Sequence, residues 1–265
     1  MGKYAAYTIT TLKNTQVYKF DLLLRIMNSF ILVIAFREIW KAIYANGQGL
    51  ALSTGVTSQG MQTYAMLSVI LFAIMPPSIS YEISDKVRDG SIVFDMQKPW
   101  DFEWMHFSKA AGVFVFNVVY AVIPQLIAVL LFFPIDYPAG MQAAAFAVSV
   151  LLAFLLSFLI NFIVGMLAIL FTETWGIDMF KSVIIDICSG AMIPLWFFPD
   201  AVSRVLLWLP FQGIFNIPLS LFIGKITGAA VWEQLAFQAV WCLLLLLLSR
   251  MILAWIERKL VISGG

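Results

Sequence analysis

The chain has 265 residues, of which 62% are hydrophobic and 12% are charged, and its formal net charge is +1. Soluble domains typically carry about 25% charged residues, so this composition excludes an ordinary soluble fold and predicts an integral membrane protein. The near-neutral charge gives no basic field for nucleic acid, and one His with two Cys predicts neither a His-rich metal site nor a disulfide scaffold.

Six apolar segments are long enough to cross a bilayer, which takes about 20 mostly apolar residues. In chain order they cover approximately residues 20–44, 61–79, 109–133, 143–171, 177–198 and 235–256. The third contains Pro124, which a membrane helix tolerates because neighbouring helices can satisfy the freed carbonyl. The predicted fold class is an all-α membrane protein with six transmembrane helices, in one transmembrane domain over residues 1–265. A weakly amphipathic stretch at residues 3–18 predicts a helix on the membrane surface.

The segment between the fifth and sixth predicted spans, residues 199–232, is too apolar for a free loop. Pro199, Pro210 and Pro218 divide it into pieces, because proline interrupts a helix. We therefore expect short re-entrant helices that dip back into the membrane from the outer side, where surrounding protein covers their ends.

The distribution of Lys and Arg predicts the orientation of the chain. With the N-terminus inside, 12 of the 16 basic residues lie at the cytoplasmic side. The four that remain outside are Arg37, Lys41, Arg204 and Lys225. Cytoplasmic loops of membrane proteins carry an excess of Lys and Arg, so both termini are predicted to be cytoplasmic.

One stretch, from Glu82 to Lys109, holds ten of the 31 charged residues. It also contains many apolar and aromatic residues, which a solvated spacer between helices would not need. Aromatic anchors ringed by charge are typical of docking surfaces, so residues 82–109 are predicted to bind a cytoplasmic partner. The alternatives are a solvated loop and a segment packed on lipid. The docking residues we expect are Glu82, Asp85, Arg88, Asp89, Gly90 and Trp100, and Gly90 also suits a helix C-cap.

The sequence contains no nucleotide-binding loop of the G-x-x-x-x-G-K-[ST] type. Its closest match is Gly224-Lys225-Ile226-Thr227, which lacks the first Gly and lies on the predicted outer side. The single His, His106, and the isolated acidic residues form no catalytic constellation. We therefore expect neither an enzyme nor a cofactor bound by this chain.

Asp186 lies about ten residues into the fifth predicted span. Charge at membrane depth points to a functional site, because its insertion costs a few kcal/mol. Ser182, Asp186, Ser189 and Gly190 fall on one helical face and predict a polar stripe along a transport pathway. The alternative for Asp186 is a structural hydrogen bond to a neighbouring helix.

Several motifs together resemble the permease subunit of type-2 ABC exporters. They are the stretch from Glu82 to Gly90 after the second span, Ser189-Gly-Ala-Met-Ile-Pro194, Phe198-Pro199 and Leu209-Pro210. The opening stretch from Lys19 to Arg25, the stretch from Trp40 to Tyr44 and the final Gly264-Gly265 are similar to a subgroup of unassigned substrate.

This resemblance implies a mechanism and a set of partners. The segment 82–109 would form a coupling helix seated in a cleft of a separate cytoplasmic ABC ATPase, which holds the ATP and Mg. A second permease chain would pair with this one in the bacterial cytoplasmic membrane and form an export pathway. Residues 199–232, with Pro194, Pro199 and Pro210, would form an outer gate. The alternative is an ATP-independent secondary transporter or a polytopic membrane enzyme, although the inverted repeat typical of secondary transporters is not evident.

Overall fold

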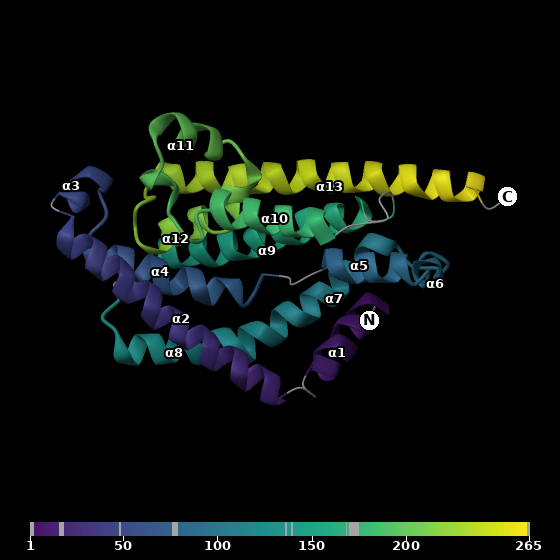
Figure 1. Ribbon diagram of the computed structural model, residues 1–265, viewed down its shortest axis with the longest axis horizontal. Coiled ribbons are helices and arrows are strands. Elements are labelled where there is room, and N and C mark those ends of the chain that lie inside the picture. The colour runs from purple at the N-terminus through teal and green to yellow at the C-terminus, as the bar shows by residue number, and fades with distance from the viewer. Residues whose placement is uncertain are drawn as a thin grey trace.

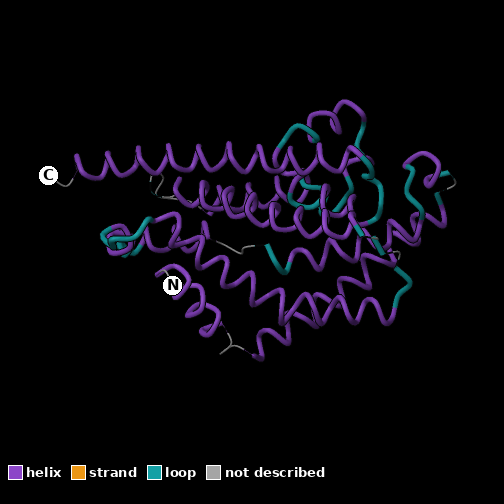
Figure 2. The backbone as a smooth tube through the Cα atoms, turned by 180° about the vertical axis from the view of Figure 1, so that it is seen from behind, coloured by secondary structure: helices purple, strands orange, loops and turns teal. Residues whose placement is uncertain are grey.

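The computed structural model describes residues 3–15, 19–47, 49–75, 79–135, 137–138, 140–167, 169 and 175–263. Throughout these ranges the regular structure is helical, with no strand (Figure 2). The long helices run along one axis, with both termini near α5 and α6 at one end and with α3 and α11 at the other (Figure 1). We call these the α5–α6 end and the α3–α11 end.

The helices in chain order are α1 (Lys3–Thr15), α2 (Lys19–Asn46), α3 (Leu50–Thr54), α4 (Ser58–Phe72), α5 (Ile79–Arg88), α6 (Ile92–Met96), α7 (Phe102–Asn117), the π-helical turn η1 (Val118–Val122), α8 (Ile123–Phe132), α9 (Met141–Leu167), α10 (Trp175–Cys188), the 3₁₀ turn η2 (Leu195–Phe197), α11 (Asp200–Leu206), the 3₁₀ turn η3 (Pro210–Gly213), α12 (Asn216–Phe222) and α13 (Ala229–Ser263). The first of them, α1, agrees with the helix predicted for residues 3–18, of which residues 16–18 lie outside the described residues.

Within the described residues, three helical segments are long and apolar enough to cross a membrane. They cover Phe102–Phe132, Met141–Leu167 and Ala229–Arg258, with 31, 27 and 30 residues. These segments contain the third predicted span almost entirely, most of the fourth and the whole of the sixth. Large apolar side chains on their surfaces are exposed, such as Leu131, Phe132 and Met251. Such an apolar surface suits lipid, and a soluble monomer rarely carries one.

Of the other three predicted spans, the first lies entirely within α2, and the second and fifth are longer than the helices α4 and α10. Although α2 has 28 residues, charges near both of its ends leave no long uncharged stretch. The helices α4 and α10 have only 15 and 14 residues. The prediction of a helix continuing to Phe198 is wrong, because α10 ends at Cys188 and Gly190 adopts a left-handed conformation with φ +81°. The count of six spans therefore stays a prediction, with three supported by helix length and composition.

Pro124 explains the π-helical turn within the segment from α7 to α8. Proline has no amide hydrogen and its ring collides with the carbonyl four residues earlier, which belongs to Tyr120. The helix widens over Val118–Val122, where the Ile123 amide donates to the Val118 carbonyl. This widening lets the helix continue past the proline to Phe132.

The centre of the bundle is α9, against which α5, α12 and α13 pack. Residues 156–162 of α9 are all buried, which is typical of a helix surrounded by protein. Gly165 allows α5 to approach closely, since a Cβ atom there would lie 2.9 Å from Cδ1 of Ile83 and 3.1 Å from Cα of Ser80. The helix α5 is therefore held directly against the core of the bundle.

Between α10 and α13 the structure has the short helices predicted for this region. Prolines begin three of them: Pro194 precedes η2, Pro199 precedes α11 and Pro210 is the first residue of η3. The fourth, α12, begins at Asn216, and Pro218 lies in its first turn instead of breaking the segment. The residues from Asn216 to Leu221 of α12 are all buried, in contact with α9 and α4. Their re-entry into the membrane stays a prediction.

Candidate functional site

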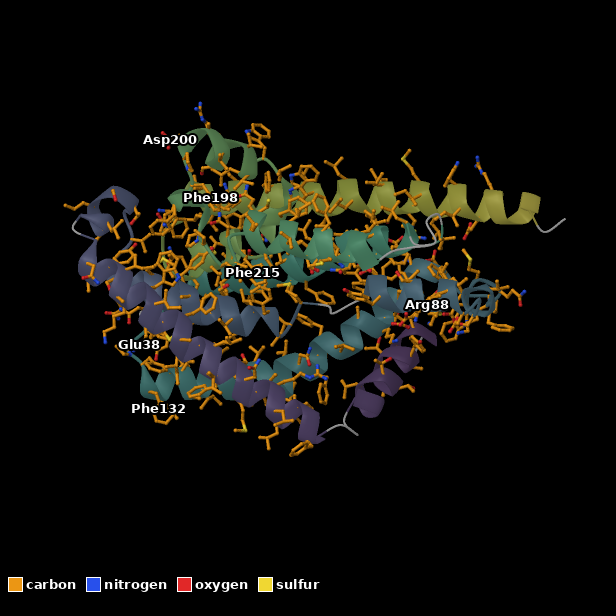
Figure 3. All side chains as sticks on the ribbon, in the orientation of Figure 1. Glu38, Arg88, Phe132, Phe198, Asp200 and Phe215 are labelled. Carbon is orange, nitrogen blue, oxygen red and sulfur yellow. The ribbon has the colours of Figure 1, made fainter. Side chains whose placement is uncertain are left out.

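The predicted docking segment forms a helical hairpin at the α5–α6 end. Gly90 ends α5 in a left-handed conformation with φ +78°, so the predicted C-cap is confirmed. The Asp89 carboxylate then accepts a hydrogen bond of 2.8 Å from the Ser91 amide, and α6 begins at Ile92. We call residues 85–96 the α5–α6 tip. Figure 3 shows Arg88 of this tip at the far end of the molecule from Glu38 and Asp200.

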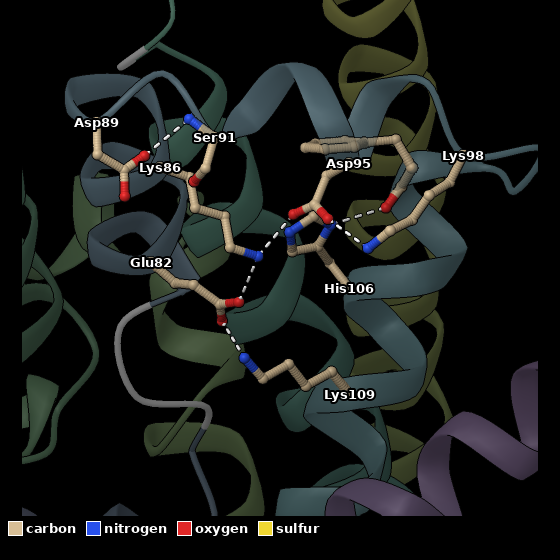
Figure 4. A network of polar contacts seen from close by, with 9 residues as sticks. Glu82, Lys86, Asp89, Ser91, Asp95, Lys98, His106 and Lys109 are labelled. Atoms are coloured by element: carbon tan, nitrogen blue, oxygen red, sulfur yellow. Dashed lines mark hydrogen bonds and ion pairs between the residues drawn. The ribbon is translucent and has the colours of Figure 1, made fainter.

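A chain of ion pairs fixes the hairpin to α7 (Figure 4). Glu82 lies 3.0 Å from Lys86 and 2.6 Å from Lys109, measured between oxygen and Nζ. Lys86 also contacts Asp95 at 2.6 Å, and Asp95 contacts Lys98 at 2.5 Å. Glu82 and Asp95 therefore join α5, α6 and α7 to one another.

The electrostatics keep these groups charged at neutral pH. Burial raises the pKa of Glu82, but the hydrogen bonds and charges of Lys109 and Lys86 outweigh burial and hold this pKa below its usual range. Burial likewise raises the pKa of Asp95, and Lys86 and Lys98 lower it overall. Burial lowers the pKa of Lys86, and its carboxylate partners raise it overall. These ion pairs thus stabilise the charged forms of Glu82, Asp95 and Lys86.

Replacing Asp95 by Asn is expected to lower the free energy of unfolding by about 1–3 kcal/mol, because two charge-assisted hydrogen bonds from Lys86 and Lys98 are lost. Since the folded state lowers the pKa of Asp95, its stabilisation is present above the usual aspartate pKa of about 3.9 and is lost as pH falls through the lowered value. The difference in the free energy of unfolding between wild type and Asp95→Asn should therefore fall to near zero in that acidic range. Unfolding of the detergent-solubilised protein across pH measures this.

Asp85 provides the matched control for Asp95. It pairs with Arg88 at 3.0 Å, but both side chains are largely exposed, at 68% and 81%. Exposed pairs contribute only about 0–1 kcal/mol, so Asp85→Asn should be nearly neutral. Equal losses for both variants, or a pH-independent difference for Asp95→Asn, would contradict the role given to Asp95.

The exposed part of the α5–α6 tip is apolar and flanked by charge. Phe94 is 70% exposed and Val93 is 50% exposed. Asp85, Arg88 and Asp89, all exposed, belong to the same hairpin. The docking residues expected from the sequence did not include Phe94 or Val93, although their position in a short helix directly after Gly90 was a usable signal.

Trp100 lies away from this tip, under the N-terminal helix. Its ring makes edge contacts with Tyr4 and Tyr7 of α1, with centroid distances of 6.1 and 5.7 Å. The neighbouring Glu103 is buried and forms an ion pair of 2.6 Å with Arg250 of α13. This region therefore joins α1, α7 and α13 to one another.

The predicted polar stripe on α10 divides into two parts. Asp186 and Ser182 line a cavity of about 230 Å³, which we call the Asp186 cavity. Ser189 and Gly190 lie instead in a buried junction beyond the end of α10. There the Ser189 carbonyl accepts from the Asn216 amide at 2.9 Å, and the Gly190 carbonyl accepts from the Tyr64 hydroxyl at 2.7 Å.

Lys181 was not singled out from the sequence, yet it connects three helices. Its ammonium donates to Ser80 Oγ of α5 at 2.7 Å, to Asn161 Oδ1 of α9 at 2.7 Å and to Asp178 Oδ1 of α10 at 3.0 Å. All three partners are buried. The signal in the sequence was an acid and a lysine three residues apart in an apolar segment, a spacing that allows a pair on one helical face.

The three prolines of the predicted outer gate lie at the α3–α11 end. Pro194 and Pro210 are buried, and Pro199 is exposed. Nearby, the Lys225 ammonium donates a hydrogen bond of 2.6 Å to the Thr54 carbonyl. Its Nζ also lies over the Trp196 ring, 4.3 Å from the ring centroid. These contacts connect the turn after α12 to Trp196 of η2 and to Thr54, the last residue of α3.

Comparison with known proteins agrees with this architecture. Residues 30–264 match the family model described as "ABC-2 family transporter protein". No curated protein and no solved structure matches the sequence significantly. The match covers most of the chain, including α4 to α13 in full. The chain therefore belongs to the ABC-2 family of transporter proteins, as a membrane component of transport.

Proposed function

We propose that this chain is the permease subunit of an ATP-driven ABC exporter. It pairs with a second permease chain, the same or a homologous one, and couples to separate cytoplasmic ATPase subunits that bind ATP and Mg. It lies in the bacterial cytoplasmic membrane with both termini and the α5–α6 tip in the cytoplasm. Membership of the ABC-2 family and the apolar helices support this proposal.

The observation that carries the proposal is the α5–α6 tip. An exposed Phe94 beside Val93 leaves apolar surface in water, which is unfavourable unless a partner covers it. Charged side chains flank this pair, as the polar rim of an interface does. The tip is also held rigidly by the ion pairs of Glu82 and Asp95, so that a partner's motion would be passed on to α5.

The contacts that lead from the α5–α6 tip into the bundle also support transmission of the ATPase's motion to the transport pathway. Gly165 brings α5 against α9, and Lys181 joins α5 to α10. When ATP closes the two ATPase subunits, movement of the tip displaces α5. Because Lys181 joins α5 to α10 through hydrogen bonds, α10 moves with it, and the pathway between the two permeases changes its access. Pro194, Pro199 and Pro210 lie at the opposite end, where the outer gate would open.

Copurification tests this function. A tagged full-length chain extracted in mild detergent from its native cells is expected to bring down a protein that hydrolyses ATP. The same extraction with an unrelated tagged membrane protein of similar abundance is the control. If no ATPase is enriched over this control in detergent or in native nanodiscs, the proposed function is wrong, and an ATP-independent transporter becomes the better description.

A further inference from the structure

Asp186 has no partner for its charge among the residues that the structure describes. It forms no hydrogen bond or ion pair anywhere in the described residues, and it is not among those with further contacts. Its side chain lies 11 residues after the start of α10, about 16 Å along the helix at about 1.5 Å per residue. In the proposed six-span arrangement, a carboxylate at that depth that faced lipid would be uncompensated, so a cationic group in its cavity would stabilise it.

Lys181 lines the same cavity, but its ammonium already has acceptors for all of its N–H groups. Lys181 has three N–H groups, and Ser80, Asn161 and Asp178 accept from its ammonium within 3.0 Å. No N–H group of Lys181 is left for Asp186 or for an anionic ligand. The charge that the cavity offers to a ligand is therefore the negative charge of Asp186.

Ser157, Asn161 and Ser182 are the uncharged polar residues in the lining of the Asp186 cavity, and its other walls are aromatic and apolar. Phe72 of α4 and Phe215 lie with their ring centroids 4.6 Å apart, and Tyr81 of α5 adds a third ring. Figure 3 shows Phe215 inside the bundle, and Phe72 and Tyr81 are 42% and 41% exposed, so the cavity reaches the surface of the chain. Aromatic faces attract organic cations through their quadrupoles, most strongly where water is excluded.

The volume sets the size of the group that fits. About 230 Å³ is somewhat below the roughly 300–1,000 Å³ of pockets that hold whole drug-sized ligands. It accommodates an ammonium group with one ring, while the rest of a larger molecule would extend through the exposed side.

We propose that the Asp186 cavity binds the cationic group of an aromatic or amphipathic organic cation, with Asp186 as counter-ion and Phe72, Tyr81 and Phe215 as the aromatic wall. The identification of this cation as transported cargo rests on the proposed function.

Equilibrium dialysis of tritiated phenyltrimethylammonium against the full-length protein in lipid nanodiscs tests the site, with empty nanodiscs to subtract partition into lipid. Saturable binding to wild type is expected, and Asp186→Asn should weaken it at least about tenfold because the counter-charge is lost while the shape is kept. Phe72→Leu should weaken it severalfold. Asp200→Asn, which removes an exposed carboxylate on α11, should leave it unchanged.

Neutral tert-butylbenzene has the same shape as the probe, and benzenesulfonate carries the opposite charge; neither should displace the cation. The proposal is overturned by any of three results: no saturable binding to wild type, equal binding to Asp186→Asn, or equal displacement by tert-butylbenzene. Saturable binding to wild type and its displacement by tert-butylbenzene decide between cation and shape recognition even if a variant fails to fold. This assay needs no ATPase, so the two proposals fail separately. Cation binding without a copurified ATPase would refute the ATP-driven function alone. A copurified ATPase without cation binding would refute only the cation site.

Discussion

Replacing Lys181 by Met is expected to destabilise the protein by about 3–5 kcal/mol, because removing one partner of a buried ion pair leaves an uncompensated charge. Asp178 is 1% exposed, and Ser80 and Asn161 also lose the donor that they share. Unfolding followed by tryptophan fluorescence in detergent measures the loss. Adding Asp178→Asn to the variant should recover part of it, since the buried negative charge is then absent.

Lys41 offers the matched control for Lys181. It pairs with Glu38 on the surface of α2 at 3.6 Å, with 55% of its side chain exposed. Such a pair contributes only about 0–1 kcal/mol, so Lys41→Met should be nearly neutral. A Lys181→Met variant as stable as Lys41→Met would show that the three buried hydrogen bonds do not hold α5, α9 and α10 together.

Under the proposed function, replacing Phe94 by Asp is expected to release the ATPase from this chain while leaving the chain's own fold intact. Aromatic residues at the centre of an interface commonly contribute about 2 kcal/mol or more, which corresponds to roughly 30-fold weaker binding. Since Phe94 is 70% exposed, its replacement removes little packing within the chain. The measurements are the ATPase retained on the tagged chain and transport at equal membrane abundance.

Leu52 is the matched control for Phe94, because it is 92% exposed on α3 at the opposite end. Leu52→Asp should retain the ATPase fully. If both variants retain it equally, the α5–α6 tip is not the docking site, and its exposed apolar residues then serve contact with lipid instead.

The sequence predicted the features of the fold that depend on long local patterns. Apolar length gave the segments that became α7 to α8, α9 and α13. Pro199 and Pro210 predicted the short helices of the α3–α11 end, because proline interrupts or begins a helix through its own geometry. Pro218, which was expected to divide the same segment, lies instead in the first turn of α12. Gly90 predicted the end of α5, because glycine readily adopts the left-handed conformation that ends a helix.

Features that depend on tertiary packing were not predictable in this way. Glu82 was expected to face a partner, and the structure shows that Lys109 of α7 and Lys86 engage it. Lys181 meets Ser80, 101 positions earlier in the chain, and no local pattern encodes that contact. The early end of α10 had a signal in Gly190, but the apolar residues that follow it masked the break.

An ATPase is proposed to dock on the α5–α6 tip in the cytoplasm. A photo-crosslinking amino acid placed at position 94 and, separately, at position 52 tests this in intact cells. We expect a covalent product between position 94 and an ATP-hydrolysing protein, and none from position 52. Crosslinking of the ATPase from position 52, or its absence from position 94 while the ATPase still copurifies, would contradict the docking site and the orientation together.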